Sequence, residues 1–252
     1  MSISAMTVED CKKIIRKRLG DYRYQHSVNV SKCAADLAEK YGADPHKAKI
    51  AGILHDATKE TPYPEQLQMM ERYGILLSDI EKQAPKLWHA VSGACFMEYE
   101  LGIEDEDILN AVRYHTTARK GMTTLEKVIY IADFISAERD YPGVDELRRA
   151  SRESLERVML EGLSFSMCDL SKRKMLIHPN TFEAYNEILL AIEKGVTRFY
   201  DILGACERSG QNFRQQKGNR YSSHRRQGGY HPGRLLCHSC RRQRHPSKGT
   251  SG

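Results

Sequence analysis

The sequence lacks any long apolar run. None of its 252 residues falls in a stretch that approaches the roughly 18 apolar residues of a membrane-spanning helix. The first residues, MSISAMTVEDCKKIIRKRL, carry charges throughout and lack the apolar core of a secretory signal peptide. We therefore expect a cytoplasmic protein that makes no contact with a membrane.

The cysteines do not form the pattern of a disulfide-stabilised domain. There are seven, an odd number, and five of them are widely spaced among apolar or small neighbours. These five are Cys11, Cys33, Cys95, Cys168 and Cys206. Buried thiols in a reducing compartment fit this distribution better than disulfides do.

Strand patterns are missing as well. No stretch alternates β-branched or aromatic residues with polar ones, whereas apolar residues recur at helical spacing between capping residues and glycines. We expect helices over residues 7–19, 23–41, 44–56, 64–73, 86–101, 105–115, 123–138, 144–168 and 179–203. The sequence thus predicts an all-α fold, a compact helical bundle over residues 1–204.

Charge divides the chain into two parts. Residues 205–252 contain 11 of the 39 Lys+Arg and one of the 33 Asp+Glu, which gives them a net charge of +10. The remaining 28 basic and 32 acidic residues give residues 1–204 a net charge of −4. A mildly acidic globular part does not support a nucleic-acid-binding surface over the whole protein.

Residues 205–252 are rich in Gly, Ser, Arg and Gln and poor in aliphatic residues. Such a segment cannot bury enough apolar surface to offset the entropy of ordering, so we expect a disordered basic tail. Three interpretations stay open: a zinc site, an RNA-binding arm, or a stretch that is not native to the protein. The zinc site would use Cys237, His238 and Cys240, with His231 and His245 nearby.

The most informative motif is the His55-Asp56 doublet within ILHDATK. Two side chains able to bind a metal stand side by side, and Lys59 follows three residues later. Four more candidate ligands lie on segments with helical periodicity, and all six stand beside the apolar faces of their predicted helices. The six are His26, His55, Asp56, His89, His115 and Asp133.

Taken singly, each of these residues has an ordinary explanation. A lone histidine on an apolar face is more often a core or surface residue than a ligand. Asp133 within IYIADFI is stronger evidence, because burying an unpaired carboxylate is costly. Four histidines and two aspartates that face inward together indicate a metal centre. Their nitrogen and oxygen donors suit iron, manganese, zinc or another first-row metal better than calcium.

The order H…HD…H…H…D resembles the HD-domain phosphohydrolase superfamily. The strings RYQHSVNV, ILHDATKE, HAVSGA, RYHTTAR, IYIADFISAERDYPGV and IHPNTFEAYN are similar to one branch of it, the YqeK-type symmetrical bis(5′-nucleosyl)-tetraphosphatases. The resemblance covers about residues 8–200 and does not extend to the tail. It implies an all-α HD-domain fold and hydrolysis of diadenosine tetraphosphate to two ADP.

The resemblance also implies roles for individual residues. The primary metal ligands would be His26, His55, Asp56 and Asp133, with one or two ions and iron as the usual metal. His89 and His115 match positions that bind a second metal or contact substrate phosphate. Further substrate contacts fall on Asn29, Lys86, Arg139, Ile177, His178, Pro179 and Thr181. One string departs from the family: an ADFIEPNRD-like pattern is usual, whereas this chain has Ser136-Ala137-Glu138-Arg139.

The expected chemistry is attack of a metal-activated water on a phosphate, because a metal polarises phosphoryl oxygens and lowers the pKa of bound water. Asp56 could bridge two metals, and Lys59 would add positive charge near the leaving phosphate. The guanidinium group of Arg139 suits bidentate hydrogen bonding to a phosphate. The residues expected to act in catalysis are Asp56, Lys59, His89 and His115. Lys59 could instead be a solvated lysine, and Arg139 a surface partner of Glu138 or Asp140.

Two other functions fit the same pattern. One is an HD phosphohydrolase that acts on mononucleotides, and the other is a metal-binding regulatory module without catalysis. The expected partner is a dinucleoside polyphosphate substrate, with a homodimer as one candidate assembly. Nucleic acid is expected to bind only through the basic tail.

Overall fold

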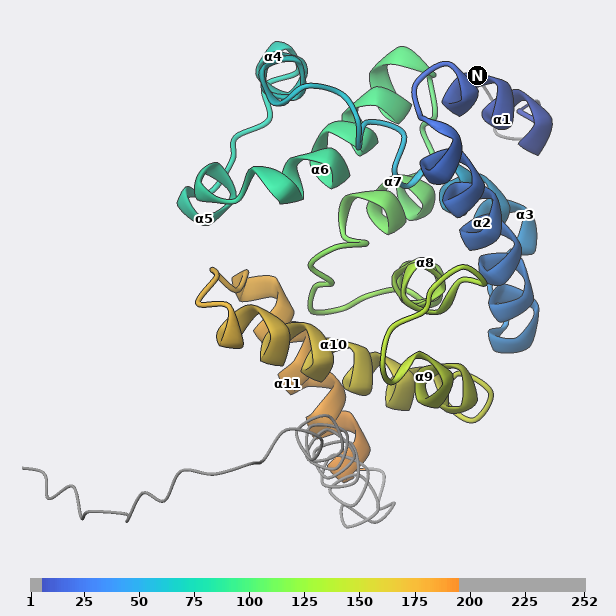
Figure 1. Ribbon diagram of the computed structural model, residues 1–252, viewed down its shortest axis with the longest axis vertical. Coiled ribbons are helices and arrows are strands. Elements are labelled where there is room, and N and C mark those ends of the chain that lie inside the picture. Colours follow the sequence, from blue (N-terminus) through green and yellow to red (C-terminus); the bar gives the residue numbers. More distant parts are fainter. Residues whose placement is uncertain (1–5, 195–252) are drawn as a thin grey trace, which may run out of the picture. The chain divides into compact units, whose positions relative to one another are not determined.

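The computed structural model describes residues 6–194 (Figure 1). Within that range the chain is helical and has no strand, which confirms the all-α prediction. No helix of the described part is long and apolar enough to cross a membrane. The boundary expected near residue 204, the basic tail and its candidate zinc ligands lie outside the described residues.

The helices follow one another with short connections. The α-helices are α1 (Val8–Arg16), α2 (Asp21–Tyr41), α3 (Pro45–Leu54), α4 (Tyr63–Arg72), α5 (Asp79–Gln83), α6 (Trp88–Cys95), α7 (Glu106–Arg113), α8 (Thr124–Ile135), α9 (Val144–Ala150), α10 (Leu155–Lys172) and α11 (Pro179–Lys194). The 3₁₀ turn η2 (Pro85–Leu87) precedes α6, and the π-helical turn η3 (Phe96–Glu100) follows it.

Side-chain caps fix the ends of the helices that carry the expected ligands. The carboxylate of Asp44 accepts hydrogen bonds from the first backbone N–H groups of α3, and Pro45 occupies the first helical position. Thr123 and Glu126 form a capping box at the start of α8. α2 ends at Gly42, whose φ of 74° is left-handed and favours glycine.

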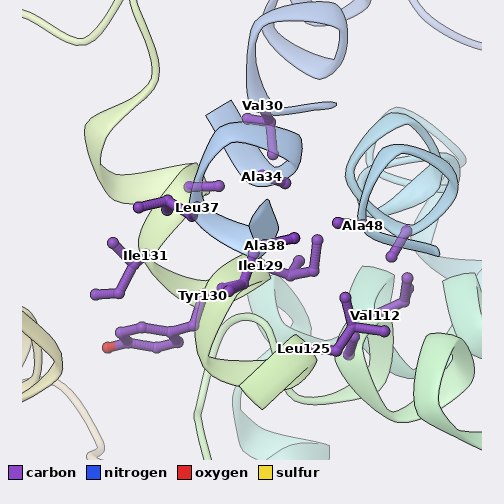
Figure 2. Close-up of a cluster of buried hydrophobic side chains, with 14 of the residues drawn as sticks. Val30, Ala34, Leu37, Ala38, Ala48, Val112, Leu125, Ile129, Tyr130 and Ile131 are labelled. Carbon is purple, nitrogen blue, oxygen red and sulfur yellow. The ribbon is translucent and has the colours of Figure 1, made fainter. Parts of the chain in front are cut away.

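The hydrophobic core lies where α2, α3, α7 and α8 meet (Figure 2). One face of α2 packs on both α3 and α8, and α7 packs on α3 and α8 from another side. The side chains labelled in the figure are Val30, Ala34, Leu37, Ala38, Ala48, Val112, Leu125, Ile129, Tyr130 and Ile131. This packing holds four ligand-bearing segments in fixed positions.

Gly52 allows α3 to approach α2 very closely. A Cβ atom at this position would stand 2.8 Å from the Cα atom of Ser31 and 3.1 Å from its nitrogen. Both neighbours are backbone atoms, so a side chain at residue 52 has no room without moving a helix. Gly52 lies one turn before His55, so this close contact of α3 with α2 is next to the doublet.

The helix expected over 144–168 is wrong, because the structure has two helices there. α9 ends at Ala150 and α10 begins after Ser154, whose Oγ accepts a hydrogen bond from the backbone N–H of Arg157. Serine at this position competes for backbone hydrogen bonds and favours a new helix start. Charged residues continue across the break between α9 and α10, so the sequence did not reveal where one helix ends and the next begins.

Three other expected helices have different bounds. The helix over 86–101 is a 3₁₀ turn, α6 and a π-helical turn in succession. The helix over 105–115 ends at Arg113, and the helix over 123–138 ends at Ile135 because Ser136 has an extended ψ of 158°. The short helix α5 was not expected, although Ser78 and Glu81 form its capping box.

Candidate metal centre

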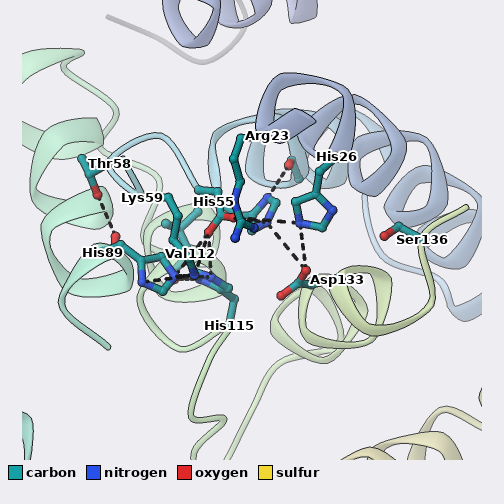
Figure 3. A network of polar contacts seen from close by, with 12 residues as sticks. Arg23, His26, His55, Thr58, Lys59, His89, Val112, His115, Asp133 and Ser136 are labelled. Atoms are coloured by element: carbon teal, nitrogen blue, oxygen red, sulfur yellow. Dashed lines mark hydrogen bonds and ion pairs between the residues drawn. The ribbon is translucent and has the colours of Figure 1, made fainter. Parts of the chain in front are cut away.

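All six expected ligands lie together (Figure 3). His26 comes from α2, His89 from α6 and Asp133 from α8. His55 is the C-cap of α3. Asp56 and His115 were expected on helices but lie in the turns that follow α3 and α7. The turns matter because they release both side chains from the helix surface and direct them toward the others.

The turn that holds the doublet is anchored to α6. The hydroxyl of Thr58 donates to the carbonyl oxygen of His89 at 2.9 Å, and its Oγ lies 2.9 Å from Oγ of Ser92. Thr58, His55 and Asp56 are all buried. The sequence HDAT therefore supplies two ligands and the hydrogen bond that fixes them against the helix bearing His89.

A first set of four donor atoms includes one oxygen of Asp56. Asp56 Oδ2 lies 3.9 Å from His26 Nε2 and 3.7 Å from His55 Nε2. Asp133 Oδ1 lies 3.0 Å from His26 Nε2 and 3.9 Å from His55 Nε2. These two nitrogens and two oxygens match the primary ligands that the family resemblance implies.

A second set surrounds the other oxygen of Asp56. Asp56 Oδ1 lies 3.2 Å from His89 Nε2 and 3.7 Å from His115 Nε2. The two Nε2 atoms are 3.1 Å apart. The carboxylate of Asp56 thus presents one oxygen to each set, which is the arrangement that a bridging ligand needs.

Backbone carbonyls orient three of the four imidazoles. In each case Nδ1 lies within hydrogen-bond distance of the carbonyl oxygen three residues earlier. Because a carbonyl only accepts, Nδ1 carries the hydrogen and Nε2 keeps its lone pair toward the centre. The three contacts are His55 to Gly52 (2.8 Å), His89 to Lys86 (2.8 Å) and His115 to Val112 (2.6 Å).

His26 is oriented differently, by a carboxylate that sequence reasoning missed. Its Nδ1 contacts Oε1 of Glu138, while Glu138 Oε2 accepts a hydrogen bond from Asn29 Nδ2 at 2.7 Å. The hydroxyl of Ser136 donates to Glu138 Oε1 at 2.6 Å. Asn29, expected to contact substrate, thus holds Glu138. The only sequence signal was the departure from the family string at 136–138, where a carboxylate stands at 138.

Burial and charge set the protonation states of these ligands. Burial lowers the pKa of His55 and of His89 to about 4, so both imidazoles are neutral at pH 7. Burial alone would raise the pKa of Asp56, but His55, His115 and His89 outweigh it and hold that pKa well below its usual range. The pKa of Asp133 is likewise lowered, against the effect of burial, by its hydrogen bond with His26. Neutral histidines and ionised carboxylates are the forms that bind metals.

Two atoms of the doublet fit a metal for a further reason. His55 Nε2 and Asp56 Oδ1 are buried and form no hydrogen bond with any described residue. Leaving such atoms unsatisfied is costly unless they are ligands. With nitrogen and oxygen donors converging from two sides, the residues present fit a divalent first-row metal.

Three cationic side chains border the carboxylates. Arg23 Nη1 lies 3.2 Å from Asp56 Oδ2, and Lys59 Nζ lies 2.9 Å from His89 Nε2 and 3.6 Å from Asp56 Oδ1. Arg139 contacts Asp133 Oδ1 and donates through Nε to the carbonyl oxygen of Asp133 at 2.8 Å. Arg139 therefore faces the centre instead of pairing with Glu138 or Asp140. Arg23 was missed, although its place three residues before His26 puts it on a neighbouring face of α2.

The charges of this group decide what it attracts. Asp56, Asp133 and Glu138 supply three negative charges, and Arg23, Lys59 and Arg139 supply three positive ones. The protein side chains therefore nearly cancel. Each divalent ion held by the ligands would make the centre positive and attractive to an anion such as a polyphosphate.

A cavity of about 250 Å³ adjoins the second set of ligands. It is lined by Leu87 and Val91, which flank His89, and by Thr116 and Thr117, which follow His115. His178 and Asn180 close its far side. Thr116 Oγ1 and His178 Nε2 are buried there and form no hydrogen bond with described residues, and Glu81, which also lines the cavity, lies with Oε1 3.9 Å from His178 Nε2.

The other expected substrate residues lie around this cavity without lining it. Thr181 donates its hydroxyl hydrogen to the carbonyl oxygen of Thr117 at 2.8 Å and so anchors the loop that carries His178. Pro179 begins α11 and is exposed, and Ile177 is half-buried. Lys86 is exposed, and its carbonyl oxygen orients His89.

Comparison with known proteins shows the family of the chain. A family model described as the HD domain matches residues 23–138, a range that includes all six expected ligands. A symmetrical bis(5′-nucleosyl)-tetraphosphatase of Bacillus subtilis (strain 168) is 41% identical over 181 residues, covering 72% of this chain and 97% of the relative. The protein of the same name from Halalkalibacterium halodurans is 38% identical over 178 residues, covering 71% of this chain and 95% of the relative.

A solved structure shares the fold. It is described as a predicted HD superfamily hydrolase involved in NAD metabolism, from Clostridium acetobutylicum. It aligns with a TM-score of 0.72 and 35% sequence identity, covering 74% of this chain and 98% of that one. The chain therefore belongs to the HD-domain family, in the branch of the symmetrical bis(5′-nucleosyl)-tetraphosphatases.

Proposed function

We propose that this protein hydrolyses diadenosine tetraphosphate symmetrically to two ADP. The observation that carries the proposal is the shared position of Asp56, whose two oxygens face two separate sets of ligands. Relatives that are named symmetrical bis(5′-nucleosyl)-tetraphosphatase support the choice of substrate.

The side chains of the centre have distinct tasks. His26, His55, Asp56 and Asp133 would hold one divalent metal. Asp56, His89 and His115 would hold a second metal or bind phosphate. When bound, the metal supplies a polarised phosphoryl oxygen and a water of lowered pKa. Lys59 lies at Asp56 and His89 and would donate hydrogen bonds to the phosphate that leaves. Arg23 and Arg139 would neutralise the remaining phosphate charges.

The cavity beside His115 would hold one nucleoside of the substrate. Its polar atoms on Thr116 and His178, which form no hydrogen bond with described residues, can bind base or ribose, while Leu87 and Val91 offer apolar contact. In this position the polyphosphate chain runs from the cavity toward Asp56. The bond between the second and third phosphates would then lie over the metal ligands.

We further propose iron as the metal. Two to four imidazole nitrogens with one or two carboxylates suit first-row divalent ions, and manganese or zinc would occupy the same donors. Cytoplasmic residence is also a proposal, and it is supported by the four cysteines of the described part, which are free thiols. A homodimer stays a proposal to be tested by the molar mass in solution.

The test is replacement of Asp56 by Asn, with metal content and products measured together. We expect loss of metal and of ADP formation, because Asn keeps the shape of the side chain but removes its charge. Asp169→Ala on α10 is the matched control, because Asp169 is about half exposed and pairs only with Arg173 among described residues. Both variants should keep the helical circular dichroism of the wild type.

The outcomes separate the competing functions. ADP as the only nucleotide product supports symmetrical cleavage, whereas AMP with ATP places the reaction at a different bond. Faster release of phosphate from mononucleotides would identify a nucleotide phosphatase. A metal-loaded wild-type protein that is inert toward all of these substrates would identify a regulatory module.

A further inference from the structure

Symmetrical cleavage requires room for two equal halves, and this inference rests on the proposed function. The cavity beside His115 has a volume of about 250 Å³. That is below the roughly 300–1,000 Å³ typical of pockets that enclose a drug-sized ligand. It therefore has room for one nucleoside only. With the central bond at Asp56, the second half must extend past the first set of ligands, on the side of His26 and Asp133.

Tyr22 stands on that side. It lies four residues before His26 on α2, which puts the two side chains on the same helix face one turn apart. Its side chain is 63% exposed. The Cζ atom of Arg23 lies 5.8 Å from the centre of the Tyr22 ring.

Two other exposed tyrosines have aromatic partners. Tyr99 stacks on Tyr73 with ring centres 4.1 Å apart, and Tyr63 contacts Trp88 edge-on. Tyr22 instead contacts Arg23, which itself reaches Asp56. Its ring thus stands at the margin of the metal centre with a face open to a ligand.

Two guanidinium groups connect Tyr22 to the centre. The side chains of Arg23 and Arg139 are 30% and 28% exposed, so each extends toward the surface from its carboxylate partner, the buried Asp56 and the partly buried Asp133. Arg139 Nη2 also lies 3.5 Å from His26 Nε2, and Tyr22 is within electrostatic range of Arg139. Guanidinium groups suit the paired oxygens of a diphosphate.

We propose that Tyr22, Arg23 and Arg139 form the subsite for the second nucleoside diphosphate half of the substrate. Tyr22 stacks on the base, and Arg23 and Arg139 bind the two phosphates between that nucleoside and the cleaved bond. The substrate then spans the centre from the cavity at His115, across Asp56, to Tyr22. Stacking is tolerant of base identity, because every base has a π face.

The test replaces Tyr22 by Ala and by Phe in the full-length, metal-loaded enzyme. The assay measures KM for diadenosine tetraphosphate and the inhibition constant of adenosine 5′-tetraphosphate, which has one nucleoside. Loss of one base stack, worth about 1–3 kcal/mol, corresponds to a rise of about five-fold or more in KM for Tyr22→Ala. The inhibition constant should move less than two-fold, because the single nucleoside occupies the cavity. Tyr22→Phe keeps the ring and should recover most of the loss.

Tyr99→Ala is the control, because it removes another exposed tyrosine away from the metal centre. The proposal is wrong if Tyr22→Ala leaves KM for diadenosine tetraphosphate within two-fold of the wild type. It is also wrong if both ligands weaken equally, since Tyr22 would then affect the phosphates or metal and not the second base. A wild-type enzyme that does not form ADP at all would reject the proposed function itself, which distinguishes the two failures.

Discussion

Glu138 contacts Nδ1 of His26 and thereby joins the turn after α8 to the N-terminal part of α2. The other imidazole nitrogen of His26 faces Asp133, so this ring lies between two carboxylates. The consequence is an imidazole with more electron density than those of His55 and His89, which donate to neutral carbonyl oxygens. Burial lowers the pKa of His26, but Asp133 and Glu138 raise it by more.

The first prediction follows from this contact. Replacing Glu138 by Gln removes the negative charge at His26 Nδ1 but keeps a hydrogen-bond acceptor. Metal affinity should fall by about 10–100-fold, the usual effect of losing an outer partner of a ligating histidine. Competition with a chromophoric chelator measures the affinity, and the absorption spectrum of the cobalt(II) form reports the changed ligand field.

The control for Glu138 is Glu146→Gln on α9. Glu146 is exposed and pairs with Arg149, which is also exposed. Its replacement should leave metal affinity unchanged. An affinity of the Glu138→Gln protein within two-fold of the wild type would show that Glu138 has only a structural role.

The sequence predicted which residues gather at the candidate centre, but not the residues that orient them. His26, His89 and Asp133 could be found because helical periodicity says which face of a helix is buried. Glu138 lies beyond the end of α8, where Ser136 turns the chain. Helical periodicity does not predict where side chains point after a helix ends. The same limit applies to Asp56 and His115, which were expected on helices and lie in turns.

Arg23 and Tyr22 were missed for another reason. Arg23 is on the helix that was expected over 23–41, and Tyr22 lies one residue before its expected start, but exposed charged and aromatic residues have no preferred partner in the sequence alone. Their significance depends on the contact of Arg23 with Asp56 and on the charge of Arg139 near Tyr22, and Asp56 and Arg139 lie in turns far apart in the chain. Only the packing of α2 on α3 and α8 brings these residues to one place.

The second prediction concerns the number of metal ions. Because Asp56 presents one oxygen to each ligand set, we expect two ions per chain in the fully loaded protein. His89→Gln should retain about one, since the set of His26, His55 and Asp133 is intact. Elemental analysis of protein loaded without oxygen measures this ratio. Equal metal content in wild type and His89→Gln would contradict the assignment of His89 as a ligand.

The third prediction is a pH dependence of the chelator-treated protein. Burial lowers the pKa of His55 from 6.5 to about 4, so an unfolded chain binds this proton at a higher pH than the folded chain. The free energy of unfolding therefore falls as the pH falls below 6.5, by about 2 kcal/mol at pH 5 for this group. His55→Gln should show a smaller decrease of the unfolding midpoint between pH 7 and pH 5.

The matched control for this experiment is His46→Gln, because His46 is exposed at the start of α3. It should keep the full pH dependence of the wild type. The raised pKa of His26 acts in the opposite direction, since its protonation stabilises the folded chain as the pH falls. The comparison of His55→Gln with His46→Gln isolates the effect of His55. Equal pH dependences in these two variants would show that His55 is not buried in its neutral form.

The fourth prediction tests the close approach of α2 and α3. A methyl group at Gly52 would meet the backbone of Ser31 at 2.8 Å, and backbone cannot move aside as a flexible side chain can. We expect Gly52→Ala to destabilise the protein by about 1–3 kcal/mol. Because the carbonyl of Gly52 orients His55, the same change should weaken metal binding. Chemical denaturation and metal titration measure the two effects.

Gly162 on α10 provides the matched comparison for Gly52. A methyl group there would meet only the side chains of Ile131 and Tyr130, both at 3.7 Å, which is ordinary van der Waals contact. Alanine also lowers the entropy of the unfolded chain, so Gly162→Ala should stabilise the protein by about 0.5–1 kcal/mol. The two substitutions should change the stability in opposite directions, because the added methyl group would meet backbone at residue 52 but only side chains at residue 162. A Gly52→Ala protein as stable as the wild type would mean that α3 can shift, and the position of the doublet would then not depend on this contact.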